Sequence, residues 1–281
     1  MVEQAALRAS IEERAVPSGD LRLLLLADEQ ALARQHHLSL RAVEMAALEA
    51  RVLPARYQRN LGTIGWDGQR RLLASTVAVV GAGGLGGYVV EGLARAGVGG
   101  LVVVDGDVFE EHNLNRQLLC TEELLGRSKA EVAAERVRQV NGAVEVRPIV
   151  AMLSADNAPQ LLAGADLVVD ALDTLPARFV LARAAREAGI PLVHGAIAGF
   201  VAQVTTIFPD DEGLALIYGR GKLPEKGIEV IYGNPAGTPM LCAAWQVQEA
   251  IKVLVGLGEP LRRRLLTIDC EFGSAESIRL G

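Results

Sequence analysis

The chain has 281 residues, a formal net charge of −6 and 50% hydrophobic residues, a composition that predicts a soluble globular protein with a sizeable core. It shows no apolar run long enough to cross a bilayer and no cleavable leader, so we expect a cytoplasmic protein without a membrane partner. Its acidic balance excludes a general affinity for nucleic acid, and any polyanion must be met by a local cluster of cations. Its three cysteines include no C-x-x-C pair, so we expect neither a disulfide framework nor a zinc site.

Residues 1–54 are expected to form a small helical appendage. Two helical patterns within residues 28–52 are broken at His36-His37-Leu38-Ser39, with Ser39 as a plausible N-cap, which is typical of a helix-turn-helix unit. Residues 1–55 hold six arginines and eight acidic residues. This charge favours a packing or partner-docking role over DNA binding.

From about residue 76, Val- and Ile-rich runs alternate with helical stretches, which predicts a doubly wound, mostly parallel α/β sheet with helices on both faces. The expected strands are 76–81, 100–105, 144–150, 165–172 and 191–198. The expected helices are 83–96, 121–141 with Thr121 as N-cap, one from about 155, and 176–188.

The pattern changes after about residue 199. Residues 200–209 and 213–218 are predicted to be strands joined by a polar turn, so we expect the sheet to become antiparallel. Residues 219–239 are rich in Gly, Pro and charge and are predicted to be a functional loop. A helix over 240–254 and strands at 263–270 and 276–280 complete a domain that we expect to span residues 55–281.

Gly81, Gly83 and Gly86 form a G-x-G-x-x-G motif between a predicted strand and a predicted helix, and Asp105 ends the next strand. The glycines allow a tight turn and close approach of phosphate to the helix N-terminus. Asp105 is suited to accept hydrogen bonds from ribose hydroxyls. The motif therefore predicts an adenine ribonucleotide with phosphates, and leaves NAD and ATP open.

Arg116, Lys129 and Asp173 are expected at the same rim of the sheet, because each follows a predicted strand. Two cations there suit a triphosphate, and a carboxylate beside phosphates suits Mg²⁺. Taken singly, Arg116 could pair with an acid such as Glu110, and Lys129 could be solvated. Their joint placement favours ATP with Mg²⁺.

Several motifs now resemble one family. They are RYQRN (56–60), GAGGLGG (81–87), DGDVFEEHNLNRQ (105–117), GRSKAEVAAERVRQVN (126–141) and VVDALDTLPARF (168–179). From about residue 56 to 280 the chain resembles the ThiF/MoeB/HesA group of the ubiquitin-activating superfamily, whose fold is Rossmann-like. The resemblance implies that the chain uses Mg-ATP to adenylate the C-terminal glycine of a ubiquitin-like sulfur carrier with a Gly-Gly tail. Such carriers serve thiamine or molybdopterin-type cofactor synthesis.

The resemblance also implies roles for individual residues. Asp105 would hold the ribose, Asn113, Arg116 and Lys129 the phosphates, and Asp173 the Mg²⁺. Arg59 would reach the nucleotide from the other subunit of a homodimer. The residues expected to contact the nucleotide are Gly81, Gly83, Gly84, Gly86, Asp105, Asp107, Asn113 and Gln117, and the residues expected to act in the reaction are Arg59, Arg116, Lys129 and Asp173.

The chain departs from better-known members in three ways. It lacks the zinc-binding C-x-x-C pairs, it has Thr174 after the Mg-linked Asp where many relatives have Asn, and it has no cysteine in the 219–239 loop. Cys242 falls in an apolar helical pattern and is predicted to be buried. Cys120 and Cys270 are predicted to be small apolar fillers.

Other functions stay open at this point. His112 and His194 are expected to be structural, because a carrier carboxylate is already ionised and needs no base. A non-catalytic nucleotide or carrier sensor would account for the appendage and the missing loop cysteine. An NAD-linked oxidoreductase would rest on the glycine motif alone. A branch of the family that adenylates a modified tRNA base shares the N-x-N-R-Q pattern, but the acidic net charge argues against it.

Overall fold

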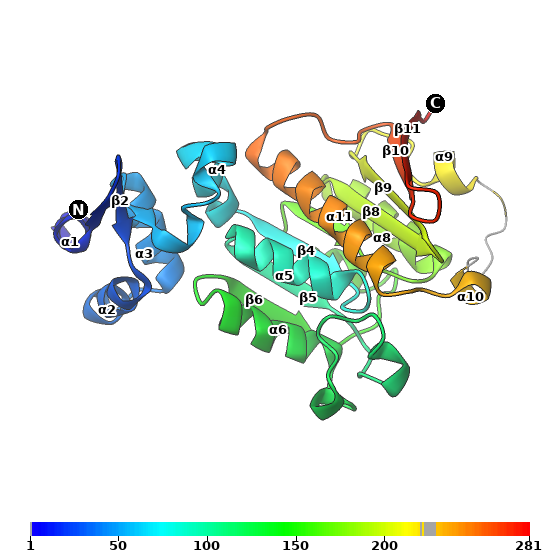
Figure 1. Cartoon of the computed structure of the whole chain (residues 1–281), viewed down its shortest axis with the longest axis horizontal. Helices are drawn as coiled ribbons and strands as arrows, with labels where there is room; N and C mark the ends of the chain where they lie inside the picture. Colours follow the sequence, from blue (N-terminus) through cyan, green and yellow to red (C-terminus); the bar gives the residue numbers. More distant parts are fainter. Residues whose placement is uncertain (1, 220, 222–228) are drawn as a thin grey trace.

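The structure is a computed structural model that describes residues 2–219, 221 and 229–281. Its central element is an eight-stranded sheet with the strand order β11-β10-β9-β8-β7-β4-β5-β6 (Figure 1). The parallel strands are β4 (Thr76–Val80), β5 (Gly100–Val104), β6 (Glu145–Ile149), β7 (Leu167–Asp170) and β8 (Leu192–Ala198). The antiparallel strands are β9 (Val201–Ile207), β10 (Arg264–Asp269) and β11 (Ser274–Arg279). The predicted fold class is confirmed.

Helices cover both faces of the sheet because side chains of the parallel strands alternate between two cores. Val77 and Val79 of β4 pack with α5 (Gly86–Ala96), α6 (Lys129–Val140) and α11 (Gly237–Val255), which lie together on one face in Figure 1. Ala78 and Val80 pack with α7 (Ala158–Leu161) and α8 (Leu175–Ala188) on the other face. None of the helices in the described ranges combines the length and the apolar composition that crossing a lipid bilayer requires.

The strand order reverses beside β4. From β4 the chain adds β5 and then β6 on one side, and it returns to add β7 on the other side. Loops that leave β4 and β7 therefore diverge, and they open a crevice at the carboxyl ends of these strands. The fold thus brings the glycine motif, which follows β4, next to the loop that follows β7.

Two predicted elements differ in the structure. The helix predicted from Thr121 begins at Lys129, where the Ser128 side chain caps it by accepting the Glu131 N–H (3.4 Å). Gly126 has a positive φ of 81° and ends the short 3₁₀ helix η3 (Glu122–Leu124) before α6 begins, so Thr121 does not cap the long helix.

The second difference follows β9. Residues 213–218, predicted to be a strand, form a turn that leads into helix α9 (Ala215–Tyr218). Its first N–H groups bond to the carbonyls of Gly213 and Leu214, and a four-residue helix is too short to show a helical pattern in the sequence. The predicted 219–239 loop lies partly outside the described residues; within it, Glu229–Tyr232 form helix α10.

An N-terminal unit, residues 2–54, packs beside the sheet domain and is the blue part of Figure 1. It contains helices α1 (Val2–Arg14), α2 (Leu26–His36) and α3 (Leu40–Glu49), and a sheet of β1 (Val16–Ser18), β2 (Leu21–Leu24) and β3 (Leu53–Pro54). The predicted helix pair is confirmed, with the Ser39 side chain accepting the Ala42 N–H (3.2 Å). Its small sheet was not predicted, because strands of two to four residues carry little periodicity. The boundary at residue 54 stays a proposal.

The N-terminal unit is joined to the sheet domain by the 3₁₀ helix η1 (Ala55–Tyr57) and by helix α4 (Leu61–Ala74). Tyr57 and Leu73 pack with Leu48 and Leu53 in a small buried cluster that spans the junction. Burial of these side chains stabilises the junction by roughly 1.5–3 kcal/mol each relative to exposure.

A Glu44→Gln change in α3 is expected to reduce the pH dependence of stability. Burial and the neighbouring Glu29 raise the pKa of Glu44 from 4.5 to about 8. Between these values the folded state binds a proton that the unfolded chain has lost, so the wild-type protein loses stability as the pH rises, by at most about 1.4 kcal/mol per pH unit. Urea unfolding across about pH 5 to 8 should give a smaller loss for the variant. Equal slopes would contradict the assignment.

Candidate nucleotide-binding site

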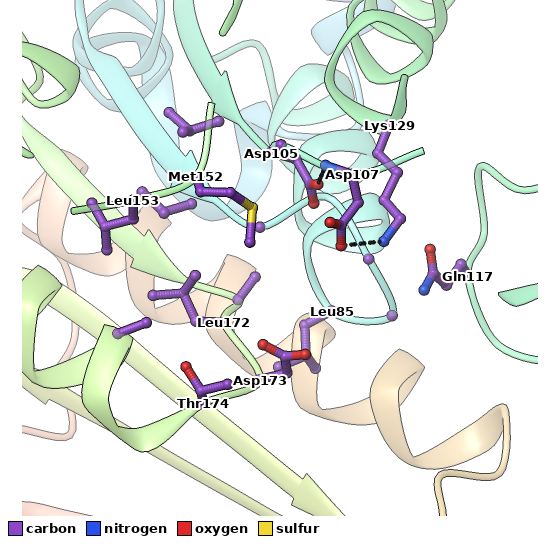
Figure 2. Close-up of a pocket in the computed structure, with 18 of the residues that line it drawn as sticks. Leu85, Asp105, Asp107, Gln117, Lys129, Met152, Leu153, Leu172, Asp173 and Thr174 are labelled. Atoms are coloured by element: carbon purple, nitrogen blue, oxygen red, sulfur yellow. Dashed lines mark hydrogen bonds and ion pairs between the residues drawn. The ribbon is translucent and has the colours of Figure 1, made fainter. Parts of the chain in front are cut away.

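A cavity of about 230 Å³ lies at the carboxyl ends of β4, β5, β6 and β7, at the crevice where the strand order reverses (Figure 2). Its walls come from the loops that follow these strands and from the start of α6. The predicted site residues that line it are Gly81, Gly83, Gly84, Asp105, Asp107, Arg116, Gln117, Lys129 and Asp173.

The glycines of the motif serve two different purposes. A Cβ atom on Gly86 would overlap the Gly81 carbonyl oxygen, and one on Gly81 would overlap the Ala171 carbonyl oxygen, so these two positions require glycine for the turn itself. At Gly83 and Gly84 the nearest atoms to such a Cβ lie 3.5 Å or farther away. Both residues line the cavity, and no atom of the described residues fills the space beside their Cα atoms. That space is therefore available to a ligand.

Gly83→Ala and Gly86→Ala are therefore expected to behave differently. The methyl group at Gly83 would project beside the cavity without clashing, so the variant should fold and bind ATP at least about tenfold more weakly, a loss of roughly 1.4 kcal/mol. The methyl group at Gly86 meets backbone and should lower Tm strongly. Thermal unfolding and calorimetric titration with ATP measure both effects; a Gly83→Ala protein with unchanged ATP affinity would contradict this division.

Asp105 is fixed at the end of β5 by backbone N–H groups. Its Oδ2 accepts a hydrogen bond from the Ala82 N–H (2.7 Å) and its Oδ1 accepts one from the Asp107 N–H (2.8 Å). Burial raises the pKa of Asp105, although these bonds and the nearby Lys129 oppose the shift. The carboxylate is thus oriented before any ligand binds, and its remaining lone pairs can accept ribose hydroxyls.

Lys129 is held in the cavity wall. Its side chain is 9% exposed, and Nζ lies 3.0 Å from Asp107 Oδ2, the ion pair drawn in Figure 2. Lys129 is also the first residue of α6, whose N-terminus faces the same region. The alternative of a solvated surface lysine is therefore wrong, and a phosphate entering the cavity would compete with Asp107 for the ammonium group.

Arg116 and Asp173 bring opposite charges to the cavity. Arg116 Nη1 donates to the His112 carbonyl oxygen (3.0 Å) and to Asn115 Oδ1 (2.9 Å), and no carboxylate of the described residues pairs with it. The alternative pair with Glu110 is not formed, since that carboxylate lies 3.2 Å from His112 Nδ1.

Asp173 follows β7 and is exposed at the cavity, where Figure 2 labels it opposite Lys129. Within the described residues its carboxylate has neither a hydrogen-bond nor an ion-pair partner. A guanidinium and a carboxylate without compensating charge in one cavity suit a ligand that brings phosphate and a cation.

Of the predicted site residues, Gly86, Asn113 and Arg59 lie outside the cavity lining. Asn113 is buried, and its Oδ1 accepts the Glu110 N–H (3.0 Å), so its carbonyl group shapes the loop that carries Arg116. Its phosphate contact stays a prediction.

Arg59 is exposed at the opposite end of α5 from the glycine motif, because the side chain of its neighbour Asn60 donates to the Ala96 carbonyl (3.2 Å). The eleven residues of α5 span roughly 15 Å. An arginine side chain cannot cover this distance within one chain.

The sequence did not reveal an apolar wall made by Met152, Leu153 and Leu172, which Figure 2 labels on the side of the cavity facing Asp105. Met152 is 68% exposed, an unusual position for an apolar side chain, and such a surface suits the face of an adenine ring. The only sequence signal was an apolar pair that begins three residues after a parallel strand.

Polar atoms without partners also mark the cavity. Gln117 Oε1 and Asn234 Oδ1 are buried and have no hydrogen-bond partner in the described part of the chain, and both residues line the cavity. Since buried polar atoms are nearly always paired, these two acceptors indicate that a ligand completes the site. Asn234 was not predicted, because it stands in the irregular segment before α11.

Arg178 of α8 is a further lining residue that the sequence did not reveal. Its Nε and Nη2 both donate to the Leu172 carbonyl oxygen (3.1 and 2.7 Å), and Nε lies 3.9 Å from Asp170 Oδ2. The guanidinium therefore fixes the loop that presents Asp173.

The cysteines are not placed for nucleophilic chemistry at this cavity. Cys242 is fully buried in α11 and donates to the Ala196 and Gln203 carbonyls, and burial raises the pKa of its thiol to about 12, so its predicted core position is confirmed. Cys120 is buried, as predicted. Cys270 is exposed just after β10, so its prediction as an apolar filler was wrong.

His112 and His194, the two histidines considered as bases, both have partners within the protein. His112 Nδ1 lies 3.2 Å from Glu110 Oε2. His194 is buried between Asp170 Oδ2 (2.6 Å from Nδ1) and the Tyr218 hydroxyl (3.0 Å from Nε2). Burial lowers the pKa of this imidazole. In the described part of the chain no three His, Cys, Asp or Glu side chains are grouped to hold a metal ion.

Comparisons with known proteins agree with this geometry. The chain is 43% identical over 229 residues to the SAMP-activating enzyme E1 of Haloferax volcanii, covering 79% of this chain and 84% of that one. It is 40% identical over 227 residues to the sulfur carrier protein adenylyltransferase of Thermus thermophilus, covering 76% and 82%. A solved structure of E. coli MccB with ATP shares the fold at 22% identity, with a TM-score of 0.64 and coverage of 98% and 88%. Residues 57–281 match the ThiF family, and the chain therefore belongs to it.

Proposed function

We propose that this protein is an adenylyltransferase that uses ATP to activate the C-terminal glycine of a ubiquitin-like sulfur carrier and releases pyrophosphate. The observation that carries the proposal is that Arg116 and Asp173 both line the cavity beside the glycine motif, while no ion pair within the described residues neutralises either of them. Two relatives that are at least 40% identical carry activating-enzyme and adenylyltransferase names and support it. We infer a role in thiamine or molybdopterin-type cofactor synthesis in the cytoplasm, with no nucleic-acid or membrane partner.

The cavity supports this chemistry residue by residue. A carboxylate and a triphosphate repel each other, so the site must neutralise both and align them at the α-phosphorus. The apolar wall at Met152 would take the adenine and Asp105 the ribose, which directs the phosphates toward Gly83 and Gly84. Arg116 and Lys129 would then stabilise the charge that builds on the departing pyrophosphate.

Asp173 is suited to hold Mg²⁺ together with phosphate oxygens, because hard cations prefer carboxylate and phosphate ligands. A bound Mg²⁺ would supply charge neutralisation at the phosphates. Asp173 sits on a loop fixed by Arg178, so its carboxylate would be presented without reorganisation.

A homodimer accounts for Arg59. This exposed side chain is separated from its own cavity by the length of α5, so it would serve the cavity of a second copy. An arginine added in this way would place a further cation at the phosphates without burying it in the free subunit.

The test is ATP–pyrophosphate exchange by the purified protein with Mg²⁺ and a panel of sulfur carriers that end in Gly-Gly. Exchange that depends on one carrier would establish adenylation and identify the carrier. ATP binding without exchange with any carrier would favour a nucleotide or carrier sensor instead. Protection from heat unfolding by NADH but not by Mg-ATP would favour an oxidoreductase. The panel should include a carrier whose terminal glycine is deleted, which must give no exchange.

A further inference from the structure

Two buried carboxylates of the N-terminal unit converge on one arginine of the segment that carries Arg59. Glu29 in α2 is 1% exposed and Glu44 in α3 is 0% exposed. Arg56 Nη2 lies 3.1 Å from Glu29 Oε2, and Arg56 Nε lies 3.2 Å from Glu44 Oε1. Residues 2–54 thus contact the sheet domain through a charged cluster at Arg56, three residues before Arg59.

The same cluster continues through Tyr57 into the sheet domain. The Tyr57 hydroxyl donates to Glu44 Oε2 (2.8 Å) and accepts from Asn141 Nδ2 (3.0 Å), which also donates to the Ala94 carbonyl near the end of α5 (3.0 Å). Arg56 bonds to Asn141 as well. Residues 56 and 57 are therefore fixed between the N-terminal unit and the carboxyl end of α5.

The other end of the segment is fixed too. Asn60 Nδ2 donates to Gln69 Oε1 (2.9 Å) and to the Ala96 carbonyl (3.2 Å). Between these two attachments Arg59 is exposed, and within the described residues it has no hydrogen bond or ion pair. A short segment that is fixed on both sides and presents one free guanidinium outward is suited to place that group in another molecule.

Stability alone is a poor explanation of the cluster. The N-terminal unit already has an apolar core, which includes Leu24, Leu32 and Val43, and Leu48 and Leu53 pack against Tyr57. Replacing buried ion pairs by apolar side chains is often neutral or stabilising, whereas directed hydrogen bonds specify one conformation. Burial keeps the pKa of Glu44 near 8, so at neutral pH a carboxylic acid there can bond to the Glu29 carboxylate.

We propose that Glu29 and Glu44 are positioning residues for the adenylation reaction, which act through Arg56 and Tyr57 to hold Arg59 toward the cavity of a second copy of the chain. This inference rests on the proposed function. It gives residues 2–54 a role in the reaction that does not require them to contact the nucleotide or the carrier.

The test compares Glu44→Ala with Glu44→Gln in ATP–pyrophosphate exchange. Alanine removes the hydrogen bond from Tyr57 and the ion pair with Arg56. We expect kcat to fall by up to about 10²-fold, because a misplacement of about 1 Å can have an effect of this order, while KM for ATP is unchanged. Glutamine keeps the shape and hydrogen bonding of a protonated Glu44 and should restore kcat. In an Arg59→Ala background, Glu44→Ala should cause no further loss. An equal loss in that background would overturn the proposal.

The matched control is Arg41→Met. Arg41 also joins the N-terminal unit to the sheet domain, through the Leu73 and Ala74 carbonyls and Glu145, but it makes no contact with the Arg59 segment in the described residues. This variant should leave kcat unchanged. A loss of kcat equal to that of Glu44→Ala would overturn the proposal, because any loosening of the N-terminal unit would then lower kcat.

Hydrogen exchange at the amides of residues 56–60 separates this inference from the proposed function. The Glu44→Ala variant should lose protection of these amides from hydrogen exchange, while Arg41→Met should keep it. This result does not depend on whether any carrier supports pyrophosphate exchange. If wild-type protein shows no pyrophosphate exchange, the proposed function is at fault, and the amide protection still decides whether Glu44 fixes the segment. Unchanged protection in Glu44→Ala would overturn the positioning role.

Discussion

Replacing Arg116 by alanine is expected to lower carrier-dependent pyrophosphate exchange by about 10²- to 10³-fold while the protein remains folded. The guanidinium lines the cavity, its described hydrogen bonds go to uncharged oxygens, and no carboxylate of the described residues forms an ion pair with it. A cation that meets phosphate charge in such a site acts mainly as that charge grows on the leaving pyrophosphate. The loss should therefore fall on kcat.

A suitable control for this variant is Arg127→Ala. Arg127 is an exposed arginine on the same loop, and it pairs with Glu135 of α6. It does not line the cavity, so exchange should be unchanged. Thermal unfolding should give a similar Tm for both variants, since exposed ion pairs contribute little to stability. Exchange by Arg116→Ala at the wild-type rate would refute the role assigned to Arg116.

The elements of the sheet domain could be predicted from the sequence, because the residue patterns that indicate them are local and repeated. Val-rich runs with helical stretches between them predicted β4 to β8, and the glycine motif predicted the turn after β4. Charges placed after strands predicted one rim, since parallel strands end on one side. Asp105 and Lys129 could thus be assigned to one rim of the sheet from the sequence alone, although no distance between their side chains could be predicted.

What the sequence could not provide depends on contacts between distant segments. Met152 and Asn234 join the cavity from irregular segments, where no periodic pattern marks them. Nothing near Arg56 in the chain indicates its ion pairs with buried carboxylates, because its partners Glu29 and Glu44 stand 27 and 12 positions before it. The short strands of the N-terminal unit were missed for a related reason, since two to four residues are too few for alternation to show.

The arrangement of Arg59 predicts that two inactive variants can restore activity when mixed. Arg59→Ala and Arg116→Ala are each expected to be inactive as homodimers, because every cavity then lacks one of the two arginines assigned to the phosphates. In a mixed dimer the cavity of the Arg59→Ala subunit keeps its own Arg116 and receives Arg59 from its partner. Subunits that reassort freely from an equal mixture would form mixed dimers in half of cases, with one intact cavity of two, so about a quarter of wild-type exchange should return.

Recovery of this size requires that the two arginines of one cavity belong to different chains. The structure gives the reason, since the Asn60 bond to Ala96 holds Arg59 at the far end of α5 from the glycine motif. A mixture of Arg116→Ala with Lys129→Ala is the matched control, because both residues line the same cavity of one chain, and no dimer then contains an intact site. Recovery in the control, or none in the first mixture although size-exclusion and mass analysis show mixed dimers, would mean that Arg59 does not act across subunits.

The double variant Arg59→Ala/Arg116→Ala mixed with wild-type chains tests the same geometry from the other side. It should leave each mixed dimer without an intact cavity, because the wild-type cavity lacks its partner's Arg59 and the variant cavity lacks Arg116, and exchange should fall faster than the wild-type fraction.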